Sequence, residues 1–526
     1  MNYSKQVEFV IKTAKPIFRY INGAIESCGI LECTGRGASI REASRDAAEQ
    51  AVKQWPNGLK DADFGGVSLT GADFSGFDLS GMALSGVNFS AAPITHYTLR
   101  GEDRNPDLPG ANLTGANLTG ANLAGSKILR ACLSNSRLKD ADFSGADLSH
   151  ANLCNADCHN VNLSGSKLYW TSCSGARFDN ARFYGANLEG ARLPRAVFWS
   201  ADFANANLQG ANLEGADLSR ADLRGVNLSN TNLSRTKLFC TKLGGADLRR
   251  AKLVGADLSA GSSAIRMTVP LSLYSEHTNL DSANLSGADL SRANLRGASL
   301  HGANLSNADL SGVLLKEACL ADADLSGATL SHADLSEANL TGAILCGLNL
   351  SNTIVTNARF TNARMSNANI SGVCFCEKEW LEDDEEFSET ANVGRPNLDG
   401  ADLSGANLSN STLRGARLRA AVLSGANLSH ADLSYAVLEG ADLRGADFSK
   451  ACFSFAKLAY AKLSESDLLR LKAETESDST VDLSEVIVER DVDASASEEQ
   501  KEPGRPRRAI RRKRGKSTVG RKPLGR

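Results

Sequence analysis

The protein has 526 residues and a nearly balanced charge, with 58 Lys and Arg against 61 Asp and Glu and a formal net charge of -3. Apolar residues make up 42% of the chain, but aromatic residues only 6%. No run approaches the ~20 apolar residues that cross a bilayer. Charges break the N-terminal stretch MNYSKQVEFVIKTAK, which lacks the apolar region of a secretory signal. We therefore expect no transmembrane segment, no general secretory export and a cytoplasmic location in the producing cell. The 12 cysteines are scattered singly, which predicts free thiols.

Residues 1–56 lack the repetition that dominates the rest of the chain. Apolar residues between Val7 and Ile21 follow helical spacing, with Pro16 as an expected kink, and residues 40–55 form a second amphipathic pattern. We predict two helices here. The second is expected to cap the repeats, because an exposed sheet edge invites pairing with other chains.

From residue 57 onwards the chain repeats one five-residue phrase. The stretch GANLTGANLTGANLAG at residues 110–125 contains it three times, and Leu recurs at every fifth position, with occasional Phe, Ile or Cys. We predict repeat blocks at 57–258, 280–375 and 398–470, the last ending in a cap around Leu468, Leu469 and Leu471. Three inserts, at 90–110, 259–279 and 376–397, reset the phase of the repeat.

A period of five fits neither a helix nor a flat strand. Five steps of ~100° place successive Leu about 140° apart around a helix. An odd period sends them to opposite faces of a pleated strand. If the backbone instead turns once in each repeat, every Leu points into a coil. Ala is then the second inward residue, Asn, Asp, Ser and Thr bond the turns, and Gly accepts the unusual angles of the corners.

Two pairs of Phe indicate the number of repeats in a coil. Phe178 precedes Phe198 by 20 residues, and Phe183 precedes Phe203 by the same step. If these rings stack in successive coils, each coil holds four repeats and is square. A triangular coil would place Phe178 below Leu193 instead.

The phrase A-[DN]-L-[ST]-x, centred on Leu or Phe, resembles that of the pentapeptide-repeat proteins, and the resemblance covers about three quarters of the chain. It implies an all-β fold, a right-handed quadrilateral parallel β-helix. We expect this solenoid to carry a short helical N-terminal cap and a disordered C-terminal tail, residues 471–526, that is first acidic and then basic. The resemblance says less about function, because the family hosts several unrelated roles.

The inserts are candidate partner-binding loops, because long loops on a rigid scaffold often carry binding residues. The second insert is apolar in places, and the third surrounds apolar residues with acidic ones. Solvated loops without a partner remain an equal alternative. The residues that we expect to contact a protein partner are Ile265, Met267, Leu271, Tyr274, Trp380, Leu381 and Phe387.

The basic tail is a second candidate site. Its cluster resembles a nuclear import signal and would also bind nucleic acid or an anionic surface by charge alone. A solubilising tail, associated with the acidic segment before it, is the alternative. The cluster consists of Arg505, Arg507, Arg508, Arg511, Arg512, Lys513, Arg514 and Lys516.

The sequence contains no constellation that predicts catalysis, a metal, a cofactor or a small-molecule substrate. Cys154, Cys158 and His159 are close in sequence, but in this register Cys158 points inwards and His159 outwards. We therefore predict a non-enzymatic scaffold that binds proteins through its faces and inserts. The N-terminal segment and tail resemble those of bacterial effectors secreted into eukaryotic cells. The alternative is a family member that mimics DNA to inhibit or protect a type II topoisomerase, although the balanced charge of the repeats disfavours it.

Overall fold

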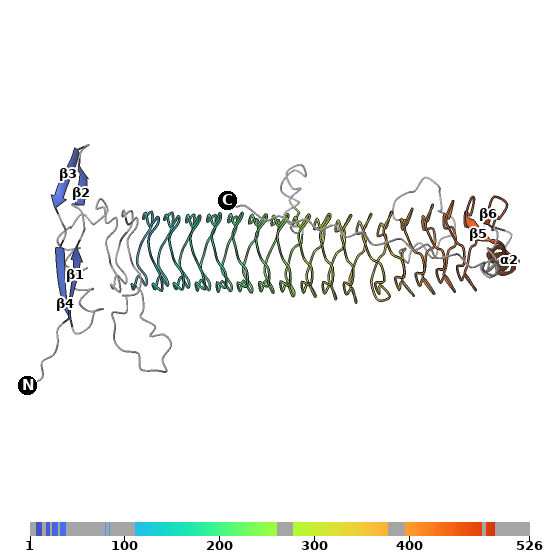
Figure 1. Cartoon of the computed structure of the whole chain (residues 1–526), viewed down its shortest axis with the longest axis horizontal. Helices are drawn as coiled ribbons and strands as arrows, with labels where there is room; N and C mark the ends of the chain where they lie inside the picture. Colours follow the sequence, from blue (N-terminus) through green and yellow to red (C-terminus); the bar gives the residue numbers. More distant parts are fainter. Residues whose placement is uncertain are drawn as a thin grey trace, which may run out of the picture.

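The computed structural model describes the strands within residues 7–37, Leu79 and Leu84, and then residues 111–259, 277–376, 395–475 and 480–489. The repeats form a long rod of stacked coils (Figure 1). Strands β1 to β4 lie at the N-terminal end of the rod and helix α2 lies at the other end (Figure 1). The rod is an all-β solenoid, as the five-residue period predicted.

Each coil contains four repeats, because parallel bridges join residues that are 20 positions apart, such as Asn112 with Cys132 and Asn117 with Arg137. The predicted stacking of aromatic rings is confirmed. Phe178 and Phe198 stack with centroids 5.1 Å apart and an interplanar angle of 3°. Phe183 and Phe203 stack at 4.5 Å and 4°. The coil is therefore four-sided.

The corner of each repeat is a hydrogen-bonded turn whose third residue has a positive φ. In the first described coil, the Ala116 N–H donates to the Leu113 carbonyl at 3.1 Å, and Gly115 between them has φ +66°. The Asn112 Oδ1 accepts from the Thr114 N–H at 3.2 Å and closes the turn from outside. This pattern recurs along the rod and confirms the expected roles of Asn, Thr and Gly.

The core is one continuous column of Leu and Ala side chains. Leu118, Leu213 and Leu305 are all fully buried. Where Ser or Thr replaces the inward Ala, its hydroxyl bonds a carbonyl of the coil, as the Ser126 Oγ–H donates to the Leu123 carbonyl at 2.6 Å. Such bonds keep a buried polar atom satisfied.

The coil has four faces, which we name by the centres of the first described coil. The first face carries Leu113, the second Leu118, the third Leu123 and the fourth Ile128, and every later centre stacks on one of these four. In each repeat, the residue before the centre and the two after it point outwards. The second of these two, which has the positive φ, lies on the edge towards the next face.

The two later inserts, at 259–279 and 376–397, leave the coil without changing its phase. Lys242 pairs with Asn279 and Arg359 pairs with Asn397, so each insert adds 17 or 18 residues to a regular 20-residue step. The phase reset seen along the sequence is therefore absent from the stacked coils. Both inserts begin after a centre of the second face and end before one of the third. They therefore leave the rod at the same edge, five coils apart.

The N-terminal prediction is wrong for residues 7–21. This region contains strands β1 (Val7–Lys12) and β2 (Ile17–Ile21), which pair antiparallel with β4 (Glu32–Gly37) and β3 (Ala24–Gly29), respectively. Val, Ile and Phe favour strands, and a short apolar run fits the two-residue period as well as the helical one. The second predicted helix, at 40–55, lies outside the described residues.

The tail prediction is wrong for residues 471–475 and 480–489. Helix α2 (Glu465–Glu474) follows the short strand β5 (Lys462–Ser464) and is capped by Ser464, whose hydroxyl accepts the Asp467 N–H. Beyond it, Asp482 bridges Lys457, and strand β6 (Ile487–Glu489) pairs in parallel with β5. The segment VDLSEVIVE thus adds half a coil, because it carries two degenerate copies of the phrase.

Candidate functional site

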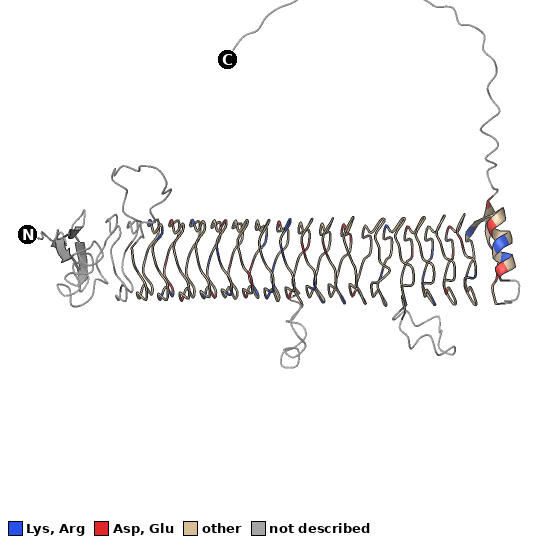
Figure 2. Ribbon diagram, turned by 90° about the horizontal axis from the view of Figure 1, so that it is seen from below, with Lys and Arg blue, Asp and Glu red and all other residues tan. Residues whose placement is uncertain are grey.

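Some charges on the rod are neutralised by close neighbours of opposite sign. In one recurring arrangement, an Asp before the centre pairs with an Arg after it, as Asp222 does with Arg224 at 2.6 Å and Asp247 with Arg249 at 2.7 Å. The hydrogen bond from Arg249 holds the pKa of Asp247 below its usual range, against the opposing effect of partial burial. Basic and acidic residues are interspersed along the rod (Figure 2).

One part of the first face combines an excess of cations with the absence of such pairs among the described residues. We call it the cationic strip. It covers the five successive coils from Leu193 to Leu290, and none of its cations forms an ion pair within the described residues. Glu214 and Asp289 are the acids on the same part of the face. The cations of the strip are Arg192, Arg195, Arg235, Lys252 and Arg292.

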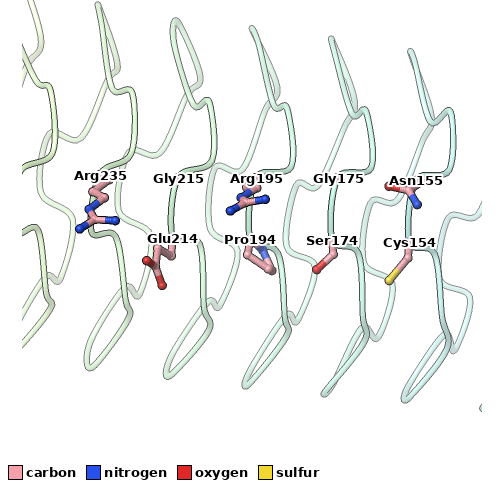
Figure 3. Close-up of a pocket in the computed structure, with 9 residues that line it drawn as sticks. All are labelled: Cys154, Asn155, Ser174, Gly175, Pro194, Arg195, Glu214, Gly215 and Arg235. Carbon is pink, nitrogen blue, oxygen red and sulfur yellow. The ribbon is translucent and has the colours of Figure 1, made fainter.

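The strip begins at a shallow groove of about 560 Å³ on the edge between the first and second faces. Figure 3 shows two rows of side chains along this groove, with Arg195 and Arg235 in one row and Glu214 in the other. Gly175 and Gly215 alternate with the longer residues and open the groove between them (Figure 3). The groove is lined by Cys154, Asn155, Ser174, Gly175, Pro194, Arg195, Glu214, Gly215 and Arg235.

The backbone of the repeat positions these arginines. Arg195 and Arg235 have φ +57° and +58° and occupy the corner position that Gly usually fills. A Cβ added at Gly215 would lie 3.7 Å from the Arg195 Cγ, so the arginine stem leans over the glycine of the next coil. Because coils rise by ~4.8 Å, Arg195 and Arg235 are about 10 Å apart along the axis. The result is a spaced row of guanidinium groups on a rigid edge.

The residues predicted as binding sites from the sequence all lie outside the described part of the chain. This holds for the insert residues from Ile265 to Tyr274 and from Trp380 to Phe387, and for the basic cluster from Arg505 to Lys516. They stay predictions. The cationic strip was missed, although its signal is visible when the sequence is written in rows of 20, where Arg195 and Arg235 share a column.

The described residues offer no arrangement for metal binding, since no three or more His, Cys, Asp or Glu converge. As predicted, Cys158 is buried and His159 points outwards, where its Nε2 lies 3.1 Å from Asp179 Oδ2 and its Nδ1 contacts Asp157. Burial raises the pKa of the Cys158 thiol well above its ordinary value. Within the same residues, no helix is both long and apolar enough to span a bilayer.

The sequence profile described as pentapeptide repeats matches most of the chain. The chain belongs to the pentapeptide repeat family. From residue 111 to 454, the described residues of the matched segments lie on the stacked coils. The unmatched stretches 239–275 and 378–390 include parts of the two later inserts. The matches are 59–101, 104–128, 131–169, 162–199, 201–238, 276–312, 308–347, 318–356, 347–377, 391–425 and 421–454.

Several solved structures are similar to the chain. HetL, involved in heterocyst differentiation regulation in the cyanobacterium Nostoc sp. strain PCC 7120, is 25% identical over 60% of this chain and 89% of its own, with a TM-score of 0.22. QnrB1, a plasmid-mediated fluoroquinolone resistance protein, is 17% identical over 52% and 96%, with a TM-score of 0.13. A thylakoid-lumen protein of Arabidopsis thaliana is 30% identical over 22% and 68%, with a TM-score of 0.10. A comparison with curated proteins gives no match.

Proposed function

We propose that this protein is a non-enzymatic scaffold and that the cationic strip binds an acidic surface of a protein partner. The observation that carries the proposal is one stretch of one face on which five cations, none ion-paired within the described residues, outnumber two acids. Like charges spaced along a rigid edge repel one another and do not stabilise the fold. A partner with spaced carboxylates would relieve this repulsion and form charge-assisted hydrogen bonds with the guanidinium groups.

The strip is formed in advance of binding, which favours recognition. Arg195, Arg235 and Arg292 project from corners that the coils hold rigidly, so less conformational entropy is lost on association than with a flexible loop. Complementary charge would also accelerate encounter and make association depend strongly on salt. The proposed site is therefore defined by its electrostatics and needs no change in the rod.

The DNA-mimic alternative requires a rod with an extended acidic surface. Residues 111–259, which contain most of the strip, carry 17 Lys and Arg against 12 Asp and Glu, so this half has the opposite sign. A DNA-supercoiling assay with purified gyrase tests the alternative directly. Under our proposal the protein leaves supercoiling unchanged, and inhibition or protection of gyrase at stoichiometric concentrations would favour the DNA mimic.

The scaffold proposal is tested with a triple variant, Arg192→Gln, Arg195→Asn and Arg235→Asn. The probe is poly-glutamate, and binding is measured by calorimetry at several salt concentrations. We expect at least ~10-fold weaker binding than for the parent protein and a shallower salt dependence, since three charge contacts are lost. Asn at the corners retains the positive φ.

The matched control removes three paired cations, with Arg224→Gln, Arg249→Gln and Arg444→Gln. It changes net charge equally, and the basic tail is present in all three proteins, so general attraction cancels. Equal weakening by both triple variants would contradict the proposal. A duplex DNA probe that binds more tightly than poly-glutamate and is lost only in the strip variant would assign the strip to nucleic acid instead.

The secreted-effector hypothesis rests on the N-terminal segment and the basic tail. It also proposes a nuclear destination in the host cell. Reporter fusions of residues 1–50 and of residues 490–526 test the two steps separately. The hypothesis requires secretion by the first fusion, and nuclear enrichment by the second would add the destination. Failure of both removes it without affecting the cationic strip.

A further inference from the structure

A solvent-exposed indole lies flat on the edge between the fourth and first faces. Trp170 is 58% exposed, although a Cβ placed on Gly190 would lie 2.8 Å from two of its ring atoms and 2.9 Å from a third. The Gly190 backbone therefore covers one face of the ring, and the other face is open to water. Only a glycine in the next coil permits this arrangement.

A row of side-chain amides follows Tyr169, the neighbour of Trp170, along the fourth face. The Asn187 amide donates to the Tyr169 hydroxyl at 3.0 Å. The Asn207 amide donates to Asn187 Oδ1 at 3.3 Å, and the Asn227 amide donates to Asn207 Oδ1 at 3.0 Å. Each oxygen is also fixed by a backbone N–H of its own turn, such as that of Glu189 at 3.0 Å. The amides are thus held in one orientation.

The row leaves hydrogen-bonding groups available. Each of the three amides has two N–H groups, of which the ladder uses one. The Tyr169 hydroxyl accepts in the ladder and keeps its own proton to donate. The side chains of Glu189 and Gln209 form no hydrogen bond or ion pair within the described residues. Gly210, one coil above Gly190, adds no side chain to the edge.

We propose that Trp170 and this row form a binding site for a neutral saccharide chain. A sugar ring presents C–H groups on its face, which fit an open aromatic ring, and hydroxyls at its rim, which require donors and acceptors in a plane. Here the ring comes first, followed by amides and one carboxylate at the spacing of the coils. From Tyr169 to Asn227 the site rises by three coils, about 14 Å, enough for a short oligosaccharide. We name this surface the saccharide platform.

Charge favours a neutral ligand. On the four coils of the platform the fourth face carries one cation, Lys167, and one anion, Glu189. A single-stranded nucleic acid could stack a base on Trp170, but such sites combine stacking with a basic groove. This site is distinct from the cationic strip on the first face and does not depend on the scaffold proposal.

The test measures binding of the full-length protein to cellohexaose, maltohexaose, xylohexaose and chitohexaose, each at concentrations up to the millimolar range. Trp emission and calorimetry give the affinity. We expect at least one hexasaccharide to bind and Trp170→Ala to weaken it about tenfold or more, since the stacking surface is removed. Asn207→Leu, which interrupts the amide row but leaves the ring, should also weaken binding.

The matched control is Trp199→Ala, which removes another exposed indole, one that lies under the Arg220 guanidinium on the second face at 5.7 Å. This variant should bind as the parent does, and circular dichroism checks that all variants are folded. No binding to any hexasaccharide, or equal loss with Trp199→Ala, would overturn the proposal. Binding of oligo-dT that is lost with Trp170→Ala, without saccharide binding, would assign the platform to nucleic acid.

Discussion

The first face of the rod contains two stretches of equal length and very different character. From Leu193 to Leu290 it carries the cationic strip. From Leu330 to Leu428 it carries no Lys, Arg, Asp or Glu in five successive coils, and Ser follows every centre. In this neutral stretch, an amide ladder joins Asn349, Asn369 and Asn407 at 3.0 and 3.1 Å. The centres behind both stretches are fully buried in the same column.

The difference shows that the interior and the exterior of this fold are independent. Any outward residue that accepts the turn conformation leaves the Leu column unchanged, so charge can be concentrated on one stretch without altering the coil. In the neutral stretch, hydrogen bonds between Asn side chains link successive coils. The cationic strip keeps one such bond, from the Asn232 amide to Asn212 Oδ1 at 3.2 Å, and carries unpaired arginines at other positions.

The largest effect is expected from truncating a buried Leu behind each stretch. Leu213→Ala, behind the cationic strip, and Leu330→Ala, behind the neutral stretch, should each cost about 2–5 kcal/mol, because both remove a fully buried side chain. Urea unfolding followed by far-ultraviolet circular dichroism measures the change. A large cost in one stretch and none in the other would show that the two interiors are not equivalent.

Two corner glycines, Gly190 beside Trp170 and Gly372 in the neutral stretch, differ in the space around them. Gly190→Ala and Gly372→Ala both place a Cβ at positive φ, +66° and +69°, and each should cost about 1–2 kcal/mol. Only the first meets a neighbour, the Trp170 ring, while the added Cβ at Gly372 has open space. Trp emission should therefore shift with Gly190→Ala alone. An unchanged spectrum would contradict the flat packing of the indole.

Acidification should reduce the stabilising contribution of the ion-paired His159 but leave that of His332 unchanged. Burial acts to raise the pKa of Asp157, but the hydrogen bond and charge of His159 outweigh it and hold this pKa below its ordinary value. The folded protein therefore binds this proton less readily than the unfolded chain, and the contribution to stability is present above pH ~3.9 and lost as pH falls through the lowered pKa.

Melting temperatures between pH 6 and 2 test this assignment. His159→Asn should remove an acid-sensitive contribution of about 0.2–1 kcal/mol, the range of exposed ion pairs. The control is His332→Asn in the neutral stretch, where His332 forms no ion pair within the described residues and Asn accepts its φ of +59°. The same pH dependence in both variants would refute the assignment.

The smallest effect is expected from exchanging edge residues between the stretches. Arg235 and Asn410 occupy the same edge at φ +58° and +57°. Arg235→Asn should stabilise the protein at low salt by about 0.2–0.5 kcal/mol, the usual size of a like-charge repulsion between neighbours on a surface. Asn410→Arg should have almost no effect, since no other cation lies beside it in the neutral stretch. High salt should remove the difference.

Sequence reasoning succeeded where the repeat was strong. The Leu period predicted the coil, and Phe178 with Phe198 predicted its four sides, because one residue type recurs at positions that the backbone makes equivalent. It failed at the ends. The Val7–Lys12 segment is too short for its periodicity to distinguish helix from strand, and the half coil at VDLSEVIVE diverges too far from the phrase to be recognised without its bridge to Lys457.

The sequence by itself determined the inside of this protein. A five-residue period leaves one way to bury every Leu, and local turn chemistry places Asn, Ser and Gly around it. The outside was decided only in three dimensions, because residues 20 positions apart in sequence, and more across an insert, become neighbours along one face. Arg195, Arg235 and Arg292 form an edge, and Gly190 supports Trp170, only once coils are stacked.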